Sequence, residues 1–269
     1  MNKTYLSLSN VQIYCEYIIN DKPPIMLIHG FVSSTHTFHR LIPYLKDHFS
    51  IIAIDLPGFG RSEKSKTFVY TYNNYAELII ECLDYFHLKN CYIIGHSMGG
   101  QIAMYTARKI PNRINKLILL ASSGYLQRAN KWLIYASYLP FFNIVAKHRI
   151  KKNGVRENLE NVLYDHSLIT DELIEEYKRP INEQNFSKSL VRFVRYREGD
   201  LTKEQLKEVT TPILLIWGAE DKVVPLRIGK RLVNDLPNAK LVTYEKTGHL
   251  LTEEKPSEVS NQIREFIHI

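Results

Sequence analysis

Cysteine is scarce in this sequence, and the start of the chain lacks the apolar stretch of a signal peptide. The 269 residues contain three cysteines, Cys15, Cys82 and Cys91, an odd number without the spacing of a metal site. Two of them lie within apolar stretches, so we interpret all three as small core residues rather than as a disulfide framework. Free thiols and the polar opening MNKTYLSLSN predict a reducing, cytoplasmic location.

Long hydrophobic runs and nucleic-acid motifs are also absent. The longest apolar run without a charged residue spans 132–146 and is interrupted by Pro140, whereas a membrane-spanning helix needs about 20 apolar residues. The formal net charge is +7, but no zinc-finger, glycine-rich phosphate-binding or RNA-binding motif accompanies it. We therefore expect neither a transmembrane segment nor a nucleic-acid partner.

What the sequence does contain is an ordinary globular composition. Hydrophobic residues make up 45% of the chain and charged residues 23%, which is enough for one large core. Alternating apolar residues between Leu6 and Cys15 predict two opening antiparallel strands. Short continuous apolar runs, typical of parallel strands buried on both faces, follow at 25–28, 51–54, 92–94, 117–121, 213–217 and 241–244.

Amphipathic stretches separate these strands. Apolar residues from Tyr75 to Phe86 recur with the spacing of a helix that has one buried face. Strands and helices alternate as in a wound parallel sheet, except over residues 122–205, which look helical and rich in aromatics. We predict an α/β fold with a mostly parallel eight-stranded sheet flanked by helices. Its core would be residues 1–121 and 206–269, with a helical cap inserted over 122–205.

The strongest chemical signal is GHSMG at residues 95–99, which lies directly between the predicted strand NCYII and the predicted helix QIAMYTARKI. Glycines at both ends of this motif permit a sharp turn in which the serine backbone is strained. Ser97 would then be exposed above the carboxyl edge of the sheet, at the start of a helix. The Met98 N–H at that position would stabilise a developing oxyanion.

A serine hydroxyl is a weak nucleophile without a neighbouring base, so a histidine and an acid are expected later in the chain. Asp221 and His249 each follow a predicted strand, and their loops should meet Ser97 at one edge of the sheet. Glu220 competes with Asp221, but the shorter carboxylate is the commoner orienting group. The other loop in which some families carry the acid, at 120–123, has no carboxylate.

Two further loops carry recognisable residues. His29 follows the strand at 25–28, and we assign it a structural role in which its ring hydrogen-bonds the loop backbone. The Phe31 N–H in the same loop is the predicted second oxyanion donor. Pro57 and Gly58 suit the central positions of a type II turn, which favours a tightly built loop over a catalytic one.

Together these motifs resemble the α/β-hydrolase fold superfamily over nearly the whole chain. The matching segments are HGF at 29–31, DLPGFGRS at 55–62, GHSMGG at 95–100, IWGAEDKVVP at 216–225 and TGHLL at 247–251. The resemblance implies an esterase-like or lipase-like serine hydrolase with a helical cap and the triad Ser97, Asp221 and His249. Haloalkane dehalogenases and epoxide hydrolases of this superfamily have an aspartate nucleophile, so Ser97 argues against both classes. C–C bond hydrolases typically carry asparagine where this sequence has His96, which makes that class less favoured but does not remove it.

The predicted cap has an unusual charge distribution. Residues 125–155 contain six lysines and arginines, no acidic residue and several aromatic rings. These rings either pack the cap onto the core or line a pocket, for which the candidates are His96, Trp132, Tyr138 and Phe142; His96 is otherwise a loop-packing residue. A basic, aromatic cap could admit an apolar or anionic acyl substrate and contact a membrane peripherally.

Three functions remain open from the sequence. The leading one is hydrolysis of a carboxylic ester or thioester through an acyl-enzyme on Ser97, which needs no cofactor and no metal. The same triad could instead cleave a C–C bond of a vinylogous diketone. The third is a ligand-binding protein that keeps the fold without turnover.

Overall fold

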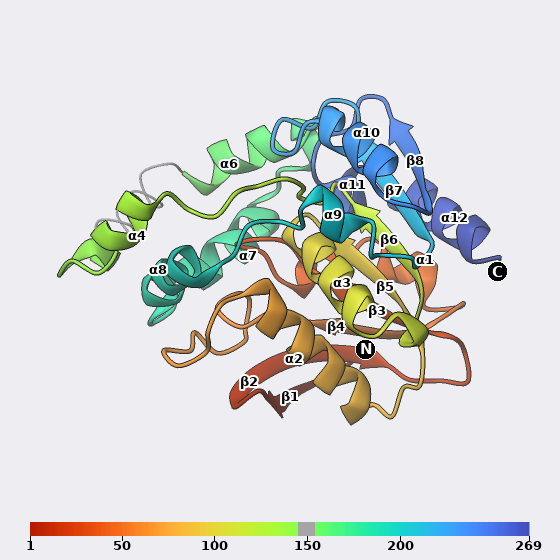
Figure 1. Ribbon diagram of the computed structural model, residues 1–269. Coiled ribbons are helices and arrows are strands. Elements are labelled where there is room, and N and C mark those ends of the chain that lie inside the picture. Colours follow the sequence, from red (N-terminus) through yellow and green to blue (C-terminus); the bar gives the residue numbers. More distant parts are fainter. Residues whose placement is uncertain (145–153, 269) are drawn as a thin grey trace.

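The computed structural model describes residues 1–144 and 154–268 and shows an α/β fold built on one sheet (Figure 1). The strands are β1 (Asn2–Leu8), β2 (Val11–Ile18), β3 (Pro24–Ile28), β4 (Ser50–Ile54), β5 (Cys91–His96), β6 (Ile114–Leu120), β7 (Ile213–Gly218) and β8 (Ala239–Tyr244). They pair in the order β1-β2-β4-β3-β5-β6-β7-β8. β2 pairs antiparallel with β1 and β4, and the remaining pairs are parallel. The predicted fold class is confirmed.

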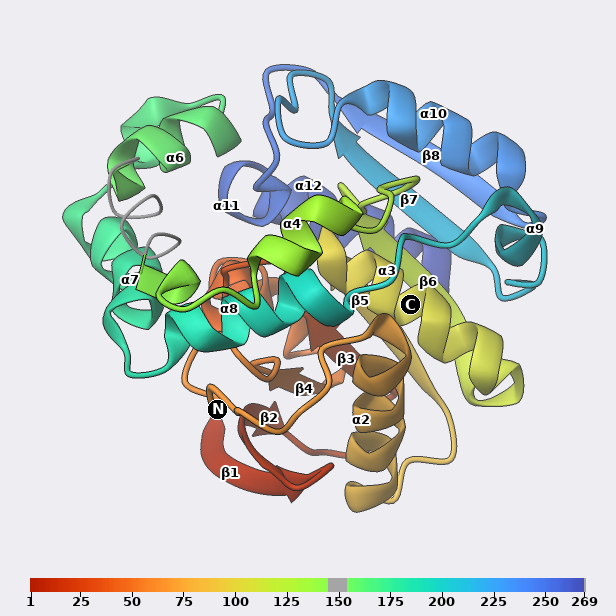
Figure 2. The same cartoon turned by 60° about the vertical axis from the view of Figure 1, so that its left-hand side comes forward.

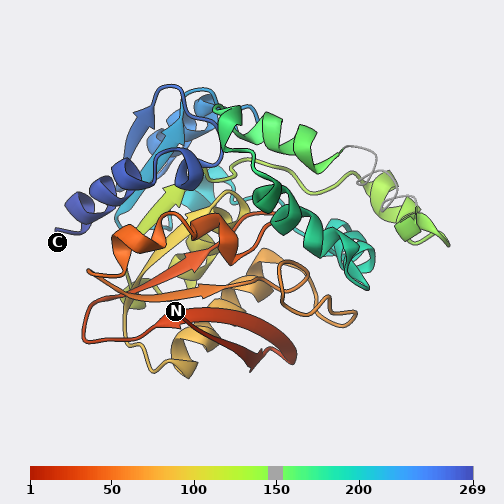
Figure 3. The same ribbon diagram turned by 180° about the vertical axis from the view of Figure 1, so that it is seen from behind.

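Helices cover both faces of this sheet. They are α1 (Ile42–Leu45), α2 (Tyr72–Tyr85), α3 (Met98–Lys109), α10 (Leu226–Asp235), α11 (Leu251–Glu254) and α12 (Pro256–Ile267). α2, α3 and α10 lie on the face turned to the viewer in Figure 1, whereas α1 and α12 lie on the face seen in Figure 3. Because both faces are covered, the central strands are buried on both sides, which explains their continuous apolar runs.

The helix α2 begins three residues before the apolar spacing indicates. The Thr71 side chain accepts a hydrogen bond of 3.1 Å from the Asn74 N–H. Threonine favours this capping position because its hydroxyl oxygen satisfies one of the free N–H groups of the first turn. The cap therefore sets the start of the helix, and the apolar residues from Tyr75 onward only set its buried face.

Between β6 and β7, the described residues form helices and no strand. The helices are α4 (Lys131–Ala136), α6 (Val155–Val162), α7 (Asp171–Asn182), α8 (Phe186–Tyr196) and α9 (Lys203–Leu206). α4, α6, α7 and α8 lie outside the layers that flank the sheet (Figure 2). The division into a core and a cap at residues 122 and 205 stays a prediction. The basic residues Lys147, Arg149, Lys151 and Lys152 lie outside the described residues.

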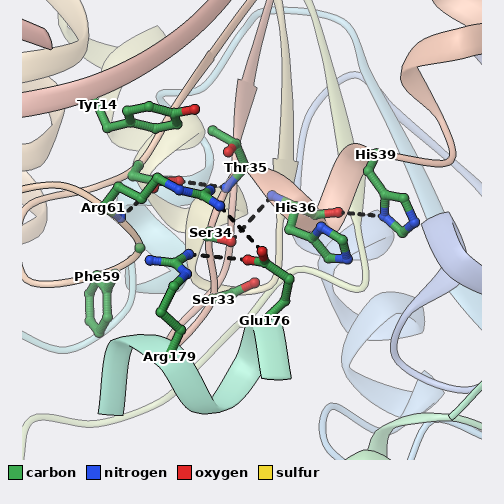
Figure 4. A network of polar contacts seen from close by, with 12 residues as sticks. Tyr14, Ser33, Ser34, Thr35, His36, His39, Phe59, Arg61, Glu176 and Arg179 are labelled. Carbon is green, nitrogen blue, oxygen red and sulfur yellow. Dashed lines mark hydrogen bonds and ion pairs between the residues drawn. The ribbon is translucent and has the colours of Figure 1, made fainter. Parts of the chain in front are cut away.

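Ion pairs join α7 to the loop that follows β4. Arg61 Nη2 lies 3.2 Å from Glu176 Oε1, and Arg179 Nη2 lies 3.1 Å from Glu176 Oε2 (Figure 4). Buried Lys64 pairs with Glu183 at the end of the same helix. The inserted helices are thus anchored to the core by charge as well as by apolar packing.

The three cysteines are core residues. Cys15, Cys82 and Cys91 are free and buried, and burial raises the pKa of Cys15 and of Cys91 to about 12. Such thiols are unreactive core residues, as predicted. Among the described residues, no helix combines the length and the hydropathy that crossing a bilayer requires.

Candidate active site

Ser97 lies on a strained turn between β5 and α3. Its backbone angles are φ 52° and ψ −117°, a combination that costs energy for any residue with a side chain. A Cβ at Gly95 would lie 2.4 Å from the Gly99 carbonyl oxygen, and a Cβ at Gly99 would lie 2.1 Å from the Ile28 carbonyl oxygen. Only glycine fits at either position, so the serine can turn its half-buried side chain away from the sheet.

Asp221 and His249 form a buried pair at the same edge of the sheet. His249 Nδ1 lies 2.7 Å from Asp221 Oδ2. The other carboxylate oxygen accepts hydrogen bonds of 2.8 Å from the N–H groups of Val223 and Val224. These bonds fix the carboxylate, so that it orients the imidazole with Nδ1–H toward Asp221 and leaves Nε2 as an acceptor.

Glu220 has a different role from that of its neighbour. Its Oε2 accepts a hydrogen bond of 2.9 Å from the Thr247 N–H. The glutamate thus braces the loop that carries His249 without contacting the imidazole.

His96 connects the serine turn to the histidine loop. Its Nε2–H donates to the His249 carbonyl oxygen at 3.0 Å, and the centres of the two imidazole rings are 4.8 Å apart. Burial, assisted by the neighbouring His249, lowers the pKa of His96 to about 3, so this ring is neutral. Ser97 and His249 both belong to the described residues, and no hydrogen bond joins Ser97 Oγ to His249 Nε2 in this structure. Such bonds are often long in ligand-free enzymes and shorten when substrate binds.

His29 has the structural role that the sequence predicts. Its Nδ1–H donates to the Gly30 carbonyl oxygen at 2.7 Å, and its Nε2 accepts from the Leu56 N–H at 2.9 Å. The ring is fully buried, and burial lowers its pKa to about 4. The neighbouring Gly58 has φ +88°, as the third residue of a type II turn requires.

Because His29 and His96 are buried as neutral rings, we expect the free energy of unfolding to fall in mild acid. Their folded pKa values lie below the ordinary 6.5, so the unfolded chain binds protons first as the pH falls. At pH 5, His29 and His96 each lower the free energy of unfolding by about 2 kcal/mol relative to pH 7.5. Asp55, whose pKa burial raises to about 6, opposes this by about 1 kcal/mol.

Chemical denaturation at both pH values measures this effect. The three groups together cause a net loss of about 3 kcal/mol, of which His96→Asn should remove about two thirds. Substitution of the exposed His166 should change the loss little. If His96→Asn loses as much stability between pH 7.5 and pH 5 as the parent does, the His96 ring must be charged in the folded protein at pH 5.

A cavity of about 550 Å³ opens beside Ser97. Its lining is mostly apolar and includes Phe31, Met98, Leu126, Ala129, Leu133, Phe193, Val194, Val223, Val224, Pro225 and Ile228, with Tyr72, Ser123, Tyr125, Arg197 and Arg227 among the polar residues. Met98 is the first residue of α3, so its N–H has no partner within the helix. Phe31 and Met98 thus border the cavity together with Ser97.

The pocket residues expected from the sequence do not line this cavity. Trp132 is 80% exposed, and the Tyr138 ring lies on the surface with the Arg195 guanidinium 4.0 Å from its centre. Phe142 is half-buried and His96 is buried, and neither residue is among those that line the cavity. The cavity instead receives Leu133, because successive residues of a helix point about 100° apart and Trp132 therefore faces solvent.

Fold and site together define the class of this protein. The sequence profile of the alpha/beta hydrolase fold family matches residues 23–256. The chain therefore belongs to the α/β hydrolase fold family, and hydrolase is the class of enzyme that fold and family support.

Individual relatives extend over almost the whole chain. YugF of Bacillus subtilis strain 168, described as an uncharacterized hydrolase, is 46% identical over 262 residues, which are 97% of this chain and 96% of YugF. A 2-hydroxy-6-oxononadienedioate/2-hydroxy-6-oxononatrienedioate hydrolase of Burkholderia vietnamiensis is 27% identical over 90% of this chain and 86% of its own. The structure is similar in fold to a meta-cleavage product hydrolase from Pseudomonas fluorescens IP01, with a TM-score of 0.81, 24% identity and coverage of 98% and 97%.

Proposed function

We propose that this protein is a serine hydrolase that cleaves a carboxylic ester or thioester through an acyl-enzyme on Ser97. The observation that carries the proposal is the buried His249–Asp221 contact of 2.7 Å at the sheet edge where a strained serine borders an apolar cavity. A strained, half-exposed serine has little structural use, whereas a nucleophile needs this exposure.

The proposed reaction has two halves. His249 Nε2 takes the Ser97 hydroxyl proton while Oγ attacks the carbonyl carbon, and the same proton then passes to the leaving alcohol or thiol. In the second half, His249 deprotonates a water that attacks the acyl-enzyme, and the proton returns to Ser97. The N–H groups of Met98 and Phe31 stabilise the oxyanion in both halves, and Asp221 stabilises the imidazolium.

The lining of the cavity supports an apolar acyl group as the substrate part that binds there. Leu133 and Phe193 come from the insertion, while Val224 and Ile228 come from the region after Asp221. Burial of an alkyl chain against such side chains contributes about 0.8 kcal/mol per methylene. We therefore expect kcat/KM to rise with acyl length until the cavity is filled.

A fluorophosphonate probe tests the proposal directly. One adduct per chain should form, and peptide mapping should locate it on Ser97. His249→Ala should abolish labelling. His166→Ala should not, because His166 is exposed and its ring contacts the Glu160 carbonyl oxygen instead of the proposed triad. A folded protein that is not labelled would favour the non-catalytic ligand-binding alternative.

C–C bond hydrolysis is the second candidate. Its support is the similarity to relatives whose names state that chemistry, together with Arg197 and Arg227 at the cavity, which could pair with a substrate carboxylate. Parallel assays with p-nitrophenyl esters and with a vinylogous diketone acid separate the two. Turnover of the diketone alone, lost in Ser97→Ala, would replace the ester proposal.

We further propose that the insertion contacts anionic membranes from a reducing, cytoplasmic location. α4 has no buried residue, and Trp132 and Phe141 are 80% and 73% exposed. Arg128 and Lys131 precede Trp132 in the chain, within a stretch that has no acidic residue. Large exposed apolar groups next to basic ones are typical of surfaces that bind anionic lipid.

Vesicle sedimentation measures this contact. The protein should pellet with phosphatidylglycerol vesicles and much less with phosphatidylcholine. The double variant Trp132→Ser with Phe141→Ser should reduce binding about tenfold or more. Tyr85→Ser, which removes an exposed ring from α2, should not. Equal binding by all variants would refute the contact.

A further inference from the structure

Two histidines lie side by side on a short helix away from the serine. The 3₁₀ helix η1 (Thr35–Phe38) contains His36 and is followed by its C-cap residue, His39. A 3₁₀ helix has three residues per turn, so positions three apart lie on the same side. The two rings are stacked, with centres 4.0 Å apart and planes 14° apart (Figure 4).

A buried carboxylate faces these rings from another part of the chain. Glu253 in α11 is 3% exposed, and its Oε1 lies 3.2 Å from His39 Nδ1. This oxygen makes no hydrogen bond among the described residues. Leaving a buried carboxylate oxygen without a partner is costly unless a cation is close to it. The site is therefore built to hold positive charge.

The cluster is open to ions from solvent. It borders a surface hollow of about 240 Å³ that is also lined by Glu172. The His39 side chain is 42% exposed. Arg40 also lines the hollow, but the carboxylates of Glu172 and Glu253 outnumber this one guanidinium. The exposed His39 ring gives a cation a path to the buried carboxylate.

We propose that His36, His39 and Glu253 form a binding site for a divalent transition-metal ion such as Zn²⁺. One ligand atom of each residue already lies within 4.8 Å of the other two. Tetrahedral zinc with bonds of about 2.0–2.2 Å separates its ligands by roughly 3.3–3.5 Å, so modest ring rotations complete the site. Two imidazoles and a carboxylate are a typical ligand set for such metals, and water from the hollow takes the fourth position.

The position of this site gives the metal a structural consequence. η1 begins four residues after Phe31, and α11 begins two residues after His249. A bound ion would therefore cross-link the segments that follow the proposed oxyanion donor and the proposed base. Binding itself does not require Ser97 chemistry, so the two proposals fail independently.

Co²⁺ titration of the intact protein at pH 7.5 tests the site, because Co²⁺ reports its ligands by visible absorption. We expect one Co²⁺ per chain, and added Zn²⁺ should displace it and remove the visible absorption. The three cysteines are buried and do not compete in the folded state. His36→Ala and Glu253→Gln should each weaken binding by at least about tenfold, and Ser97→Ala should leave it unchanged.

His87→Asn is the matched control. His87 is exposed and has φ +54°, which asparagine tolerates, and it lies outside the cluster. Circular dichroism verifies that each variant is folded; His36→Gln replaces Glu253→Gln if the buried substitution unfolds the chain. Absence of stoichiometric binding, or equal affinity in His36→Ala and His87→Asn, overturns the proposal.

Discussion

Replacing Ser97 by alanine is expected to lower kcat for an ester substrate by about 10⁵-fold to 10⁶-fold, with thermal stability unchanged or raised. The large loss follows because Ser97 is the proposed nucleophile, while the oxyanion donors alone supply only a small part of the acceleration. Stability should not fall, because alanine keeps the Cβ and only the half-exposed hydroxyl is lost. Steady-state kinetics and differential scanning calorimetry measure the two effects.

Substitution of the acid distinguishes two neighbouring carboxylates. Asp221→Asn should lower kcat by about 10⁴-fold, because the amide favours the wrong imidazole tautomer. Glu220→Gln is the matched control and should stay within about threefold of the parent, since its carboxylate contacts the Thr247 N–H and not His249. The reverse ranking would show that Glu220 orients the base. A variant in which Ser97, Asp221 and His249 are all substituted should be no slower than Ser97→Ala, which would show that the three residues act as a unit.

Gly99→Ala is expected to lower the free energy of unfolding by more than about 3 kcal/mol. The new methyl would lie 2.1 Å from the Ile28 carbonyl oxygen and 2.6 Å from the His29 carbonyl oxygen. Both are backbone atoms at the end of β3, which is held by pairing with β4 and β5. Because these atoms cannot move without breaking the sheet, relaxation is limited and overpacking is severe.

Gly154→Ala provides the comparison for this substitution. Gly154 precedes α6, and a Cβ there would meet nothing within 4 Å. Its effect should be within about 0.5 kcal/mol. Urea denaturation followed by circular dichroism measures both variants. A Gly99→Ala protein of near-parent stability would mean that α3 can shift away from β3, contrary to the close contact described above.

The elements of the core could be predicted because their signals are local. The apolar runs of β3 and β7 identify buried strands, and the glycines at 95 and 99 identify the serine turn. The loops of Asp221 and His249 could be brought together because parallel strands end at one edge of the sheet. The apolar spacing from Tyr75 onward does not mark the start of α2 at Tyr72, which Thr71 sets as the N-cap.

The lining of the cavity could not be predicted in the same way. Its residues come from elements far apart in the chain, and the side of α4 that faces Ser97 depends on how the insertion packs. Leu133 and Phe193 reach the cavity, whereas Trp132 faces solvent. The pair His36 and His39 has a spacing that a sequence search can find, but Glu253 lies more than 200 residues away and gives no such signal.

The sequence by itself determined the α/β fold class and the candidate triad, because alternating hydrophobic patterns and glycine spacing restrict the backbone locally. Tertiary structure alone decided which side chains border the cavity and that Glu253 meets two histidines. These contacts depend on the relative placement of whole elements. That placement is fixed by packing between surfaces that are distant in the chain. The sequence around each residue therefore does not indicate which distant residue it contacts.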